Sequence, residues 1–347
     1  MNRKTVFPEG EKQNIGRHIT LLILSGLLVF FVLCSFFWGR YPVPPKALFG
    51  ILFGRIFPLE PFWTTAQEVT VINIRMPRII LALMVGASLS LAGASYQGVF
   101  QNPMAAPDIL GASAGAGFGA ALAIYLGLNS IGITSFAFFV SLLTVALVFF
   151  ISHYTKGEPV MGLVLSGIII STLFQSGTSF IKLVADPSNK LPAITYWLMG
   201  SLAGASWHDV FFAAVPMLIG ALPLFLLRWR LNILMFGDDE ARALGLNPGK
   251  IRLIIVVCAS LLTAASVSVS GIIGWVGLVI PHMMRRLVGS NYRFLTPASV
   301  LGGSLFLLIV DDLSRNIYTS EIPIGILTAF IGAPFFILLI TRRHDWK

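Results

Sequence analysis

The sequence predicts an all-α polytopic membrane protein with about ten transmembrane helices and both termini in the cytoplasm. Of its 347 residues, 56% are hydrophobic and 11% are charged, whereas soluble domains carry roughly 25% charged residues. Apolar runs of about 20 residues recur along the whole chain, and each is long enough to cross the hydrocarbon layer as a helix. A membrane β-barrel would show short segments of alternating hydrophobicity instead.

Ten segments carry these apolar runs, with the first beginning at Ile19. The basic residues before it suggest a signal peptide, but the run reaches Trp38 without a small-residue cleavage site, so we interpret it as an uncleaved helix. The eighth segment is short and contains Pro281. The segments cover about residues 19–38, 75–99, 108–127, 131–152, 160–184, 208–228, 251–271, 275–289, 296–315 and 323–341.

The distribution of Lys and Arg predicts the orientation, because cytoplasmic loops carry an excess of both. With the N-terminus inside, the internal loops hold most of the basic residues, and the basic tail TRRHDWK is internal as well. These loops account for the net charge of +9 without nucleic-acid binding. The predicted division is a cytoplasmic segment 1–18, a single transmembrane domain 19–343 with a long cytoplasmic loop 229–250, and a tail 344–347. The other long connection, residues 39–74, lies outside, and no soluble domain fits anywhere.

The cysteines and histidines do not predict a metal or redox site. Cys34 and Cys258 both lie in apolar runs and suggest small buried side chains. His282 follows Pro281 near the inner end of its segment, and the five histidines show no paired spacing typical of metal ligands. We therefore expect no metal or cofactor on this chain.

The stretch QNPMAAPDILGASAGAGFGAA, residues 101–121, could be a phosphate-binding loop or a place of close helix packing. A phosphate loop needs a lysine or a strand-flanked glycine pattern, and neither is present. Close packing at small residues is what holds membrane helices together. We therefore expect a tight inner turn, with Asp108 as the N-cap of a close-packed helix containing Gly111, Gly115 and Gly119. Gly86, Ser90 and Gly93 predict a second close contact.

Charged residues near the outer ends of two segments suggest interfacial structural roles. Lys182 and Asp186 lie at the end of the fifth segment, and Asp311 and Asp312 lie in the ninth. Ionisable groups at membrane depth are functional candidates, but these four lie close to the outer boundary.

Five long blocks then resemble one known family in the same order. They read RMPRIILALMVGASLSLAGASYQGVFQNPMAAPDILGASAGAGFGA, ITYWLMGSL, DDEARALGL, GIIGWVGLVIPHMMRRLVG and EIPIGILTAFIGAPFFILLI. The chain resembles, from about residue 17 to 343, the FecCD-type permeases of ABC importers for iron–siderophore complexes, haem and vitamin B12. The resemblance implies a fold like that of the vitamin B12 importer permease. It also implies a second permease subunit, identical or a sister chain with the identical one favoured, together with two ATPase subunits and an extracytoplasmic substrate-binding protein. The permease would lie in the lipid of a prokaryotic plasma membrane.

The resemblance assigns three groups of site residues. Arg75, Arg78 and Arg315 would dock the binding protein through its carboxylates, which arginine pairs in a fork. The alternatives are snorkelling of Arg75 and Arg78 to lipid phosphates, and pairing of Arg315 with Asp311 one turn away. The cytoplasmic gate would lie at Pro159, Val160 and Met161, where this chain has apolar residues instead of the small polar ones of the vitamin B12 member. ATPase coupling would fall on the short amphipathic stretch Asp238, Asp239, Glu240, Ala241, Arg242, Ala243, Leu244, Gly245 and Leu246.

The function that follows is a permease subunit that moves a bulky metal chelate into the cytoplasm. A ferric siderophore or haem is favoured because iron carriers dominate the family, with cobalamin or an oxyanion as alternatives. An ion-coupled secondary transporter would need ionisable residues at mid-membrane, and an intramembrane enzyme would need a catalytic pair that the sequence does not show. The chain has no Walker motif, so ATP and Mg²⁺ are expected on the partner ATPase and catalysis is not expected here.

Overall fold

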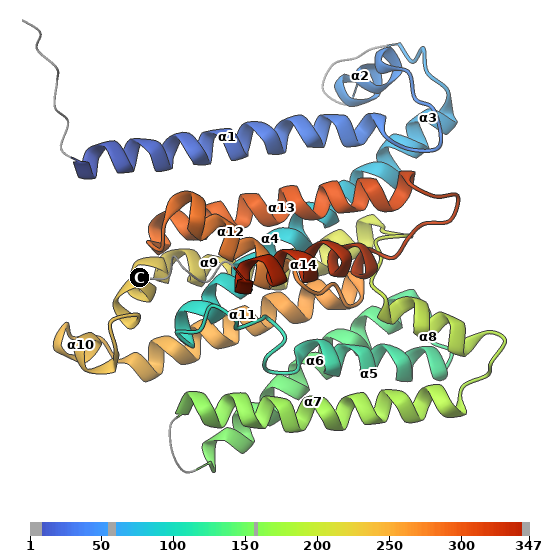
Figure 1. Cartoon of the computed structure of the whole chain (residues 1–347). Helices are drawn as coiled ribbons and strands as arrows, with labels where there is room; N and C mark the ends of the chain where they lie inside the picture. The colour runs from blue at the N-terminus through green and yellow to red at the C-terminus, as the bar shows by residue number, and fades with distance from the viewer. Residues whose placement is uncertain (1–8, 55–59, 156–158, 342–347) are drawn as a thin grey trace, which may run out of the picture.

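Helices form the regular secondary structure of the chain, and no strand occurs in the parts described. The structure is a computed structural model that describes residues 9–54, 60–155 and 159–341 (Figure 1). Each of the ten predicted segments is a helix. Their bounds are α1 Glu9–Phe37, α4 Met76–Val99, α5 Ala112–Tyr125, α6 Ser130–His153, α7 Pro159–Val184, α9 Trp207–Leu234, α11 Pro248–Ser270, α12 Val276–Val288, α13 Tyr292–Asn316 and α14 Ile324–Thr341.

Within the described residues, seven helical stretches are long and apolar enough to cross a membrane. One of them is Thr65–Val99, where the short helices α3 Thr65–Val69 and η1 Thr70–Arg75 run directly into α4. This span therefore begins ten residues before the predicted residue 75, because Thr64 and Gln67 form a capping box that starts the helix early. Three expected spans, α5, α12 and α14, are shorter. The number ten and the orientation remain predictions.

Three further short helices lie between the long ones. They are α2 Pro45–Phe53, α8 Lys190–Leu198 and α10 Asp238–Ala243. The sequence predicted only a short helix at α10, and α8 was missed because its nine residues include Pro192 and form no long apolar run. Figure 1 shows α10 at one end of the bundle and α2 and α8 at the other. These are called the α10 end and the α8 end below.

The core of the bundle lies around α4, α11 and α13, while α1 and α7 lie on opposite edges (Figure 1). In the most apolar window of each span, 78% of the residues of α4 and its extension are buried, compared with 17% for α1 and 28% for α7. A helix that exposes so much apolar surface must face lipid or another chain.

Close backbone contacts at glycine join the central helices. A methyl group on Gly86 of α4 would collide with the carbonyl of Gly303 in α13, and one on Gly93 would collide with the backbone of Gly277 in α12. Gly119 of α5 meets the carbonyl of Phe136 in α6 in the same way, and Gly115 meets the side chain of Thr144 in α6. The predicted packing role of these small residues is therefore confirmed.

The turn before α5 differs from the prediction in one respect. Helix α5 begins at Ala112, four residues after the predicted start, and its N-cap residue is Gly111. Gly111 has φ +75°, a left-handed conformation that favours glycine. Asp108 is therefore not the N-cap, although its Oδ1 still accepts the N–H of Ser113 at 3.1 Å and satisfies one free donor of the helix.

Candidate functional site

Six charged residues gather at the α8 end of α4 and α13. Arg78 is the centre of this charged cluster: its Nε and Nη2 lie 3.0 and 2.9 Å from Asp311 Oδ1, and its Nη1 donates to Glu321 at 2.9 Å. Asp311 is fully buried and Arg78 is 6% exposed. The charged cluster consists of Arg75, Arg78, Arg315, Asp311, Asp312 and Glu321, so its three positive and three negative formal charges balance.

Arg315 holds two of the carboxylates from within its own helix. Its Nε lies 3.3 Å from Asp311 Oδ2, and its Nη2 pairs with Asp312 and donates to the hydroxyl of Ser35 in α1 at 2.9 Å. The pairing of Arg315 with Asp311, given above as the alternative to docking, is therefore present. Asp312 also accepts the Ser35 hydroxyl at 2.7 Å, which ties α1 to α13.

Arg75 makes its contacts with backbone. It donates to the carbonyl oxygens of Phe36 and Tyr41, and it is 3% exposed. All three arginines assigned to docking are thus buried in this structure. A partner carboxylate would reach them only if they left their present partners, and docking by Arg75, Arg78 and Arg315 remains a prediction.

The loop that contains α10 is built around two glycines. Helix α10 lies between Gly237 with φ +119° and Gly245 with φ +76°, two conformations that favour glycine and isolate a short helix between sharp turns. Ala241 is fully buried against the bundle, whereas Ala243 and Leu244 are exposed. The loop therefore presents an apolar patch, at the α10 end, that no described residue covers.

An ion pair anchors this loop to α11. Arg252 Nη2 lies 2.9 Å from Asp238 Oδ1, and the hydrogen bonds from Arg252 lower the pKa of the Asp238 carboxyl. Asp238 is also the first residue of α10, where an acidic side chain stabilises the helix dipole. The remaining loop charges form only an exposed pair, Asp239 with Arg242 at 3.3 Å.

The predicted gate residues lie at the start of α7. Helix α7 begins at Pro159, Val160 is half-buried and Met161 is 58% exposed. The preceding residues 156–158 lie outside the described residues. The role of Pro159, Val160 and Met161 as a gate remains a prediction.

Farther along α7, polar residues gather on one exposed face. Thr172, Gln175, Ser176 and Ser179 are all exposed and recur every three or four residues. This spacing places them along one side of the helix. The sequence analysis did not single them out, although their helical spacing in an otherwise apolar segment was a usable signal.

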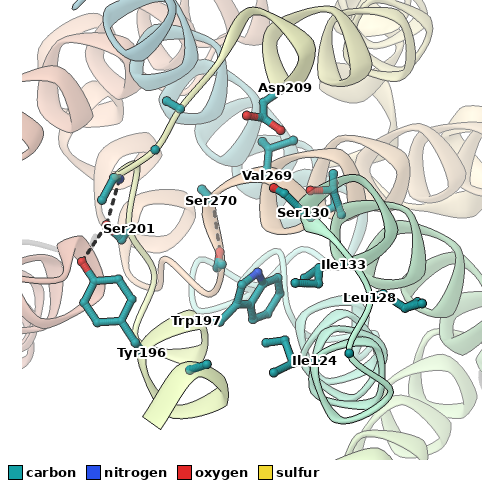
Figure 2. A pocket seen from close by; sticks show the side chains of 18 residues that line it. Ile124, Leu128, Ser130, Ile133, Tyr196, Trp197, Ser201, Asp209, Val269 and Ser270 are labelled. Carbon is teal, nitrogen blue, oxygen red and sulfur yellow. Dashed lines mark hydrogen bonds between the residues drawn. The ribbon is translucent and has the colours of Figure 1, made fainter. Parts of the chain in front are cut away.

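A cavity of about 470 Å³ opens at the α8 end (Figure 2). It lies between the α5–α6 connection, α8 and the start of α9, with Tyr196 and Trp197 from α8 beside Asp209 and Ser130. Tyr196 and Ser201 hydroxyls lie 3.4 Å apart across its edge. Asp209 is engaged in a capping box with Ser206, so this carboxylate serves the start of α9.

Comparison with known proteins identifies the family to which this chain belongs. The model of the FecCD transport family matches residues 27–342. The chain belongs to the FecCD transport family. This confirms the family resemblance found in the sequence.

Two relatives and one solved structure show how closely the FecCD chain follows its family. It is 39% identical over 319 residues to the molybdate import system permease protein MolB of Haemophilus influenzae, covering 92% of this chain and 94% of that one. It is 42% identical over 282 residues to a probable iron chelatin transport system permease protein of Helicobacter pylori, covering 81% and 85%. An inward-facing metal-chelate type ABC transporter has a TM-score of 0.83 at 38% identity, covering 93% and 98%.

The FecCD family membership fixes the coarse function. This chain is a membrane-embedded permease of an ABC importer, and such permeases work with an ATPase and a binding protein in the prokaryotic plasma membrane. The family is one of transport permeases and not of enzymes.

Proposed function

We propose that this FecCD permease works as a pair of identical copies and moves a ferric siderophore or haem into the cytoplasm along a pathway bordered by α7. The observation that carries this proposal is the exposed polar face of α7, composed of Thr172, Gln175, Ser176 and Ser179. Ten transmembrane helices with both termini inside fit the same proposal.

A polar face on an edge helix is unfavourable against lipid. Thr172 and Ser179 donate to carbonyls of their own helix at 2.9 and 3.0 Å and are therefore satisfied in hydrocarbon. The side chains of Gln175 and Ser176 are exposed and, unlike those of Thr172 and Ser179, make none of the side-chain hydrogen bonds found among the described residues. An unpaired amide in hydrocarbon costs several kcal/mol, roughly 4–8 on an alkane scale. This face therefore favours contact with water or with a second copy of the chain.

The same face disfavours an ion-coupled secondary transporter. Such a transporter needs ionisable groups near the middle of the membrane. Lys182 is the one ionisable residue in the sequence of α7, and it lies two residues from the end of the helix. A pathway bordered by neutral hydroxyl and amide groups suits a large chelate whose specificity is determined by a binding protein.

Relatives support three classes of substrate. The Helicobacter pylori relative and the solved transporter, named for an iron chelate and a metal chelate, support the chelate. The Haemophilus influenzae relative, named for molybdate and similar over 92% of this chain, supports an oxyanion as the second candidate. Cobalamin is the third.

The three sets of site residues take roles in this proposal. Arg75, Arg78 and Arg315 would meet the binding protein at the α8 end, the stretch Asp238–Leu246 would dock the ATPase, and Pro159–Met161 would close the pathway toward the cytoplasm. Because the arginines are buried, Arg75→Gln tests docking only if thermal unfolding of the permease and its affinity for the binding protein are both measured. A loss of affinity at unchanged stability would support docking.

Uptake in cells that lack this gene tests the substrate. Labelled ferric siderophores, haem, cobalamin and molybdate would be offered in parallel, with and without ATP depletion. We expect energy-dependent uptake of an iron compound to be lost and to return with the wild-type gene. Loss of molybdate uptake alone would replace the chelate with the oxyanion. Uptake that survives ATP depletion would contradict the importer.

A further inference from the structure

A groove between α1 and α13 has the shape and composition of a lipid site. Its volume is about 460 Å³, and it lies on the edge of the bundle formed by α1, where only 17% of the residues in the apolar window are buried (Figure 1). An edge this exposed faces lipid or another chain, and where lipid hydrocarbon meets an apolar groove an acyl chain is the natural occupant. The groove is lined by Phe31, Phe37, Trp38, Gly39, Ile309, Asp312, Leu313 and Asn316.

A second cavity continues the groove beyond the end of α1. It measures about 440 Å³, shares Asn316 with the groove, and contains Arg40 and Arg315. Arg40 is exposed, donates through Nη2 to the carbonyl of Tyr318 at 3.1 Å, and forms no ion pair within the described parts of the chain. Arg315 lies behind it and is occupied by Asp311 and Asp312. Arg40 thus places one uncompensated positive charge at the mouth of an apolar groove.

The depth of these residues matches the head-group region of a bilayer. The apolar span of α1 ends at Phe37, and Trp38 and Arg40 follow directly. Tryptophan and arginine are enriched at the level where hydrocarbon meets head groups, and arginine there pairs with lipid phosphate.

The groove also offers one hydrogen-bond acceptor. Asp312 is 2% exposed and lines the groove; its Oδ1 binds Ser35 and Arg315, while its Oδ2 has no hydrogen-bond partner among the described residues. A buried carboxylate oxygen without a partner is costly. A head group that carries both a phosphate and an N–H donor would pair its phosphate with Arg40 and donate its N–H to Asp312.

We propose that this groove binds one phospholipid from the leaflet at the α8 end, with an acyl chain along Phe31, Ile309 and Leu313 and the phosphate at Arg40. A head group with an ammonium donor, as in phosphatidylethanolamine, also provides a donor for Asp312. Because Ser35 and Asp312 join α1 to α13 beside the groove, the bound lipid also stabilises α1 against the bundle.

Native mass spectrometry of the full-length permease, delipidated and then titrated with single phospholipids, tests this site. Arg40→Ala should weaken phosphatidylethanolamine retention about fivefold, the equivalent of about 1 kcal/mol per basic residue near the membrane surface. Leu313→Trp should fill the groove and reduce retention further. The control is Lys182→Ala, which removes a basic residue at the same end of the bundle but away from the groove. Thermal unfolding without added lipid would show that each variant is folded.

Two results would overturn the proposal or part of it. Equal retention by the wild type, Arg40→Ala and Leu313→Trp would overturn the site. Phosphatidylcholine has the phosphate but no N–H donor, so retention equal to that of phosphatidylethanolamine would overturn the role of Asp312. Weaker retention of phosphatidylcholine supports it.

Discussion

Arg78 of α4 and Asp311 of α13 form a buried bidentate ion pair, although 233 residues separate them in the sequence. Burying two charges is favourable only when each is well paired and hydrogen-bonded. Here the remaining Arg78 nitrogen, Nη1, donates to Glu321, and the second Asp311 oxygen, Oδ2, forms an ion pair with Arg315. The pair therefore fixes the register of α4 against α13 at the α8 end.

We expect Asp311→Asn to destabilise the permease by about 3–5 kcal/mol, because it leaves two buried arginines short of a charge. Glu321→Gln is the matched control. The Glu321 side chain is 27% exposed, so its loss should cost only about 1 kcal/mol or less. Thermal unfolding of the purified permease in detergent measures both. Equal losses of stability would show that the burial of the carboxylate does not determine how much each ion pair contributes to the free energy of unfolding.

Gly86→Ala should prevent normal packing of α4 on α13, because the added methyl group meets the carbonyl of Gly303. Overpacking in a tight core costs about 1–3 kcal/mol, and here backbone must move. Gly26→Ala in α1 is the control, since nothing lies within 4 Å of the added methyl group. That change should be neutral or slightly stabilising. The yield of monodisperse protein in gel filtration compares the two, and similar yields would contradict a backbone contact.

Replacing Ala243 and Leu244 with Asp should uncouple ATP hydrolysis from uptake. Both residues are exposed beside α10, and charges there would disrupt an apolar docking patch without disturbing the buried Ala241. Leu244→Met keeps the patch apolar and should retain uptake. Proteoliposomes that contain the whole importer allow ATPase rate and uptake to be measured together. Full ATP-driven uptake by the double Asp variant would remove the coupling role.

The Asp238–Arg252 pair should contribute equally at pH 6 and pH 8. Hydrogen bonding lowers the pKa of Asp238 in the folded protein. Its contribution is therefore complete above the unfolded pKa of about 3.9 and is lost as the pH falls through the still lower folded pKa. The difference in melting temperature between the wild type and Asp238→Asn should not change from pH 6 to pH 8. A change with pH would contradict this assignment of the pair.

Cysteines on α7 test whether its polar face meets a second copy or water. In a background without Cys34 and Cys258, Ser176→Cys should react with a hydrophilic thiol reagent or form a cross-linked dimer. Leu222→Cys on α9 is the control, because Leu222 is 63% exposed on an apolar surface. Protection of both cysteines to the same degree would place α7 against lipid and contradict the proposed pathway.

The ten helices that match the predicted segments could be predicted because the bilayer demands apolar runs, and hydropathy records them directly. Their ends could not be predicted so well. Helix α9 continues to Leu234, six residues beyond its expected end, although it contains Pro216 and Pro223, because tertiary contacts override the weak preference of single residues.

The sequence also identified the charged residues of the cluster except Glu321, but not their environment. Arg75 and Arg78 read as outer-surface arginines because charge predicts exposure in most proteins. The burial of Arg78 depends on Asp311 and Glu321, more than 230 residues away, and that of Arg75 depends on the backbone carbonyls of Phe36 and Tyr41. One sequence does not reveal such pairings. The packing glycines were predictable as small residues, whereas their partner helices were not.

The distance in sequence between Arg78 and Asp311 has a consequence for biosynthesis. Helix α4 is translated long before α13. Arg78 therefore has no Asp311 carboxylate to pair with until most of the remaining chain has been made. A chain that stops before Asp311 would leave this arginine unmatched near the membrane boundary. Completion of α13 therefore provides the carboxylate that neutralises a charge which entered the membrane with α4.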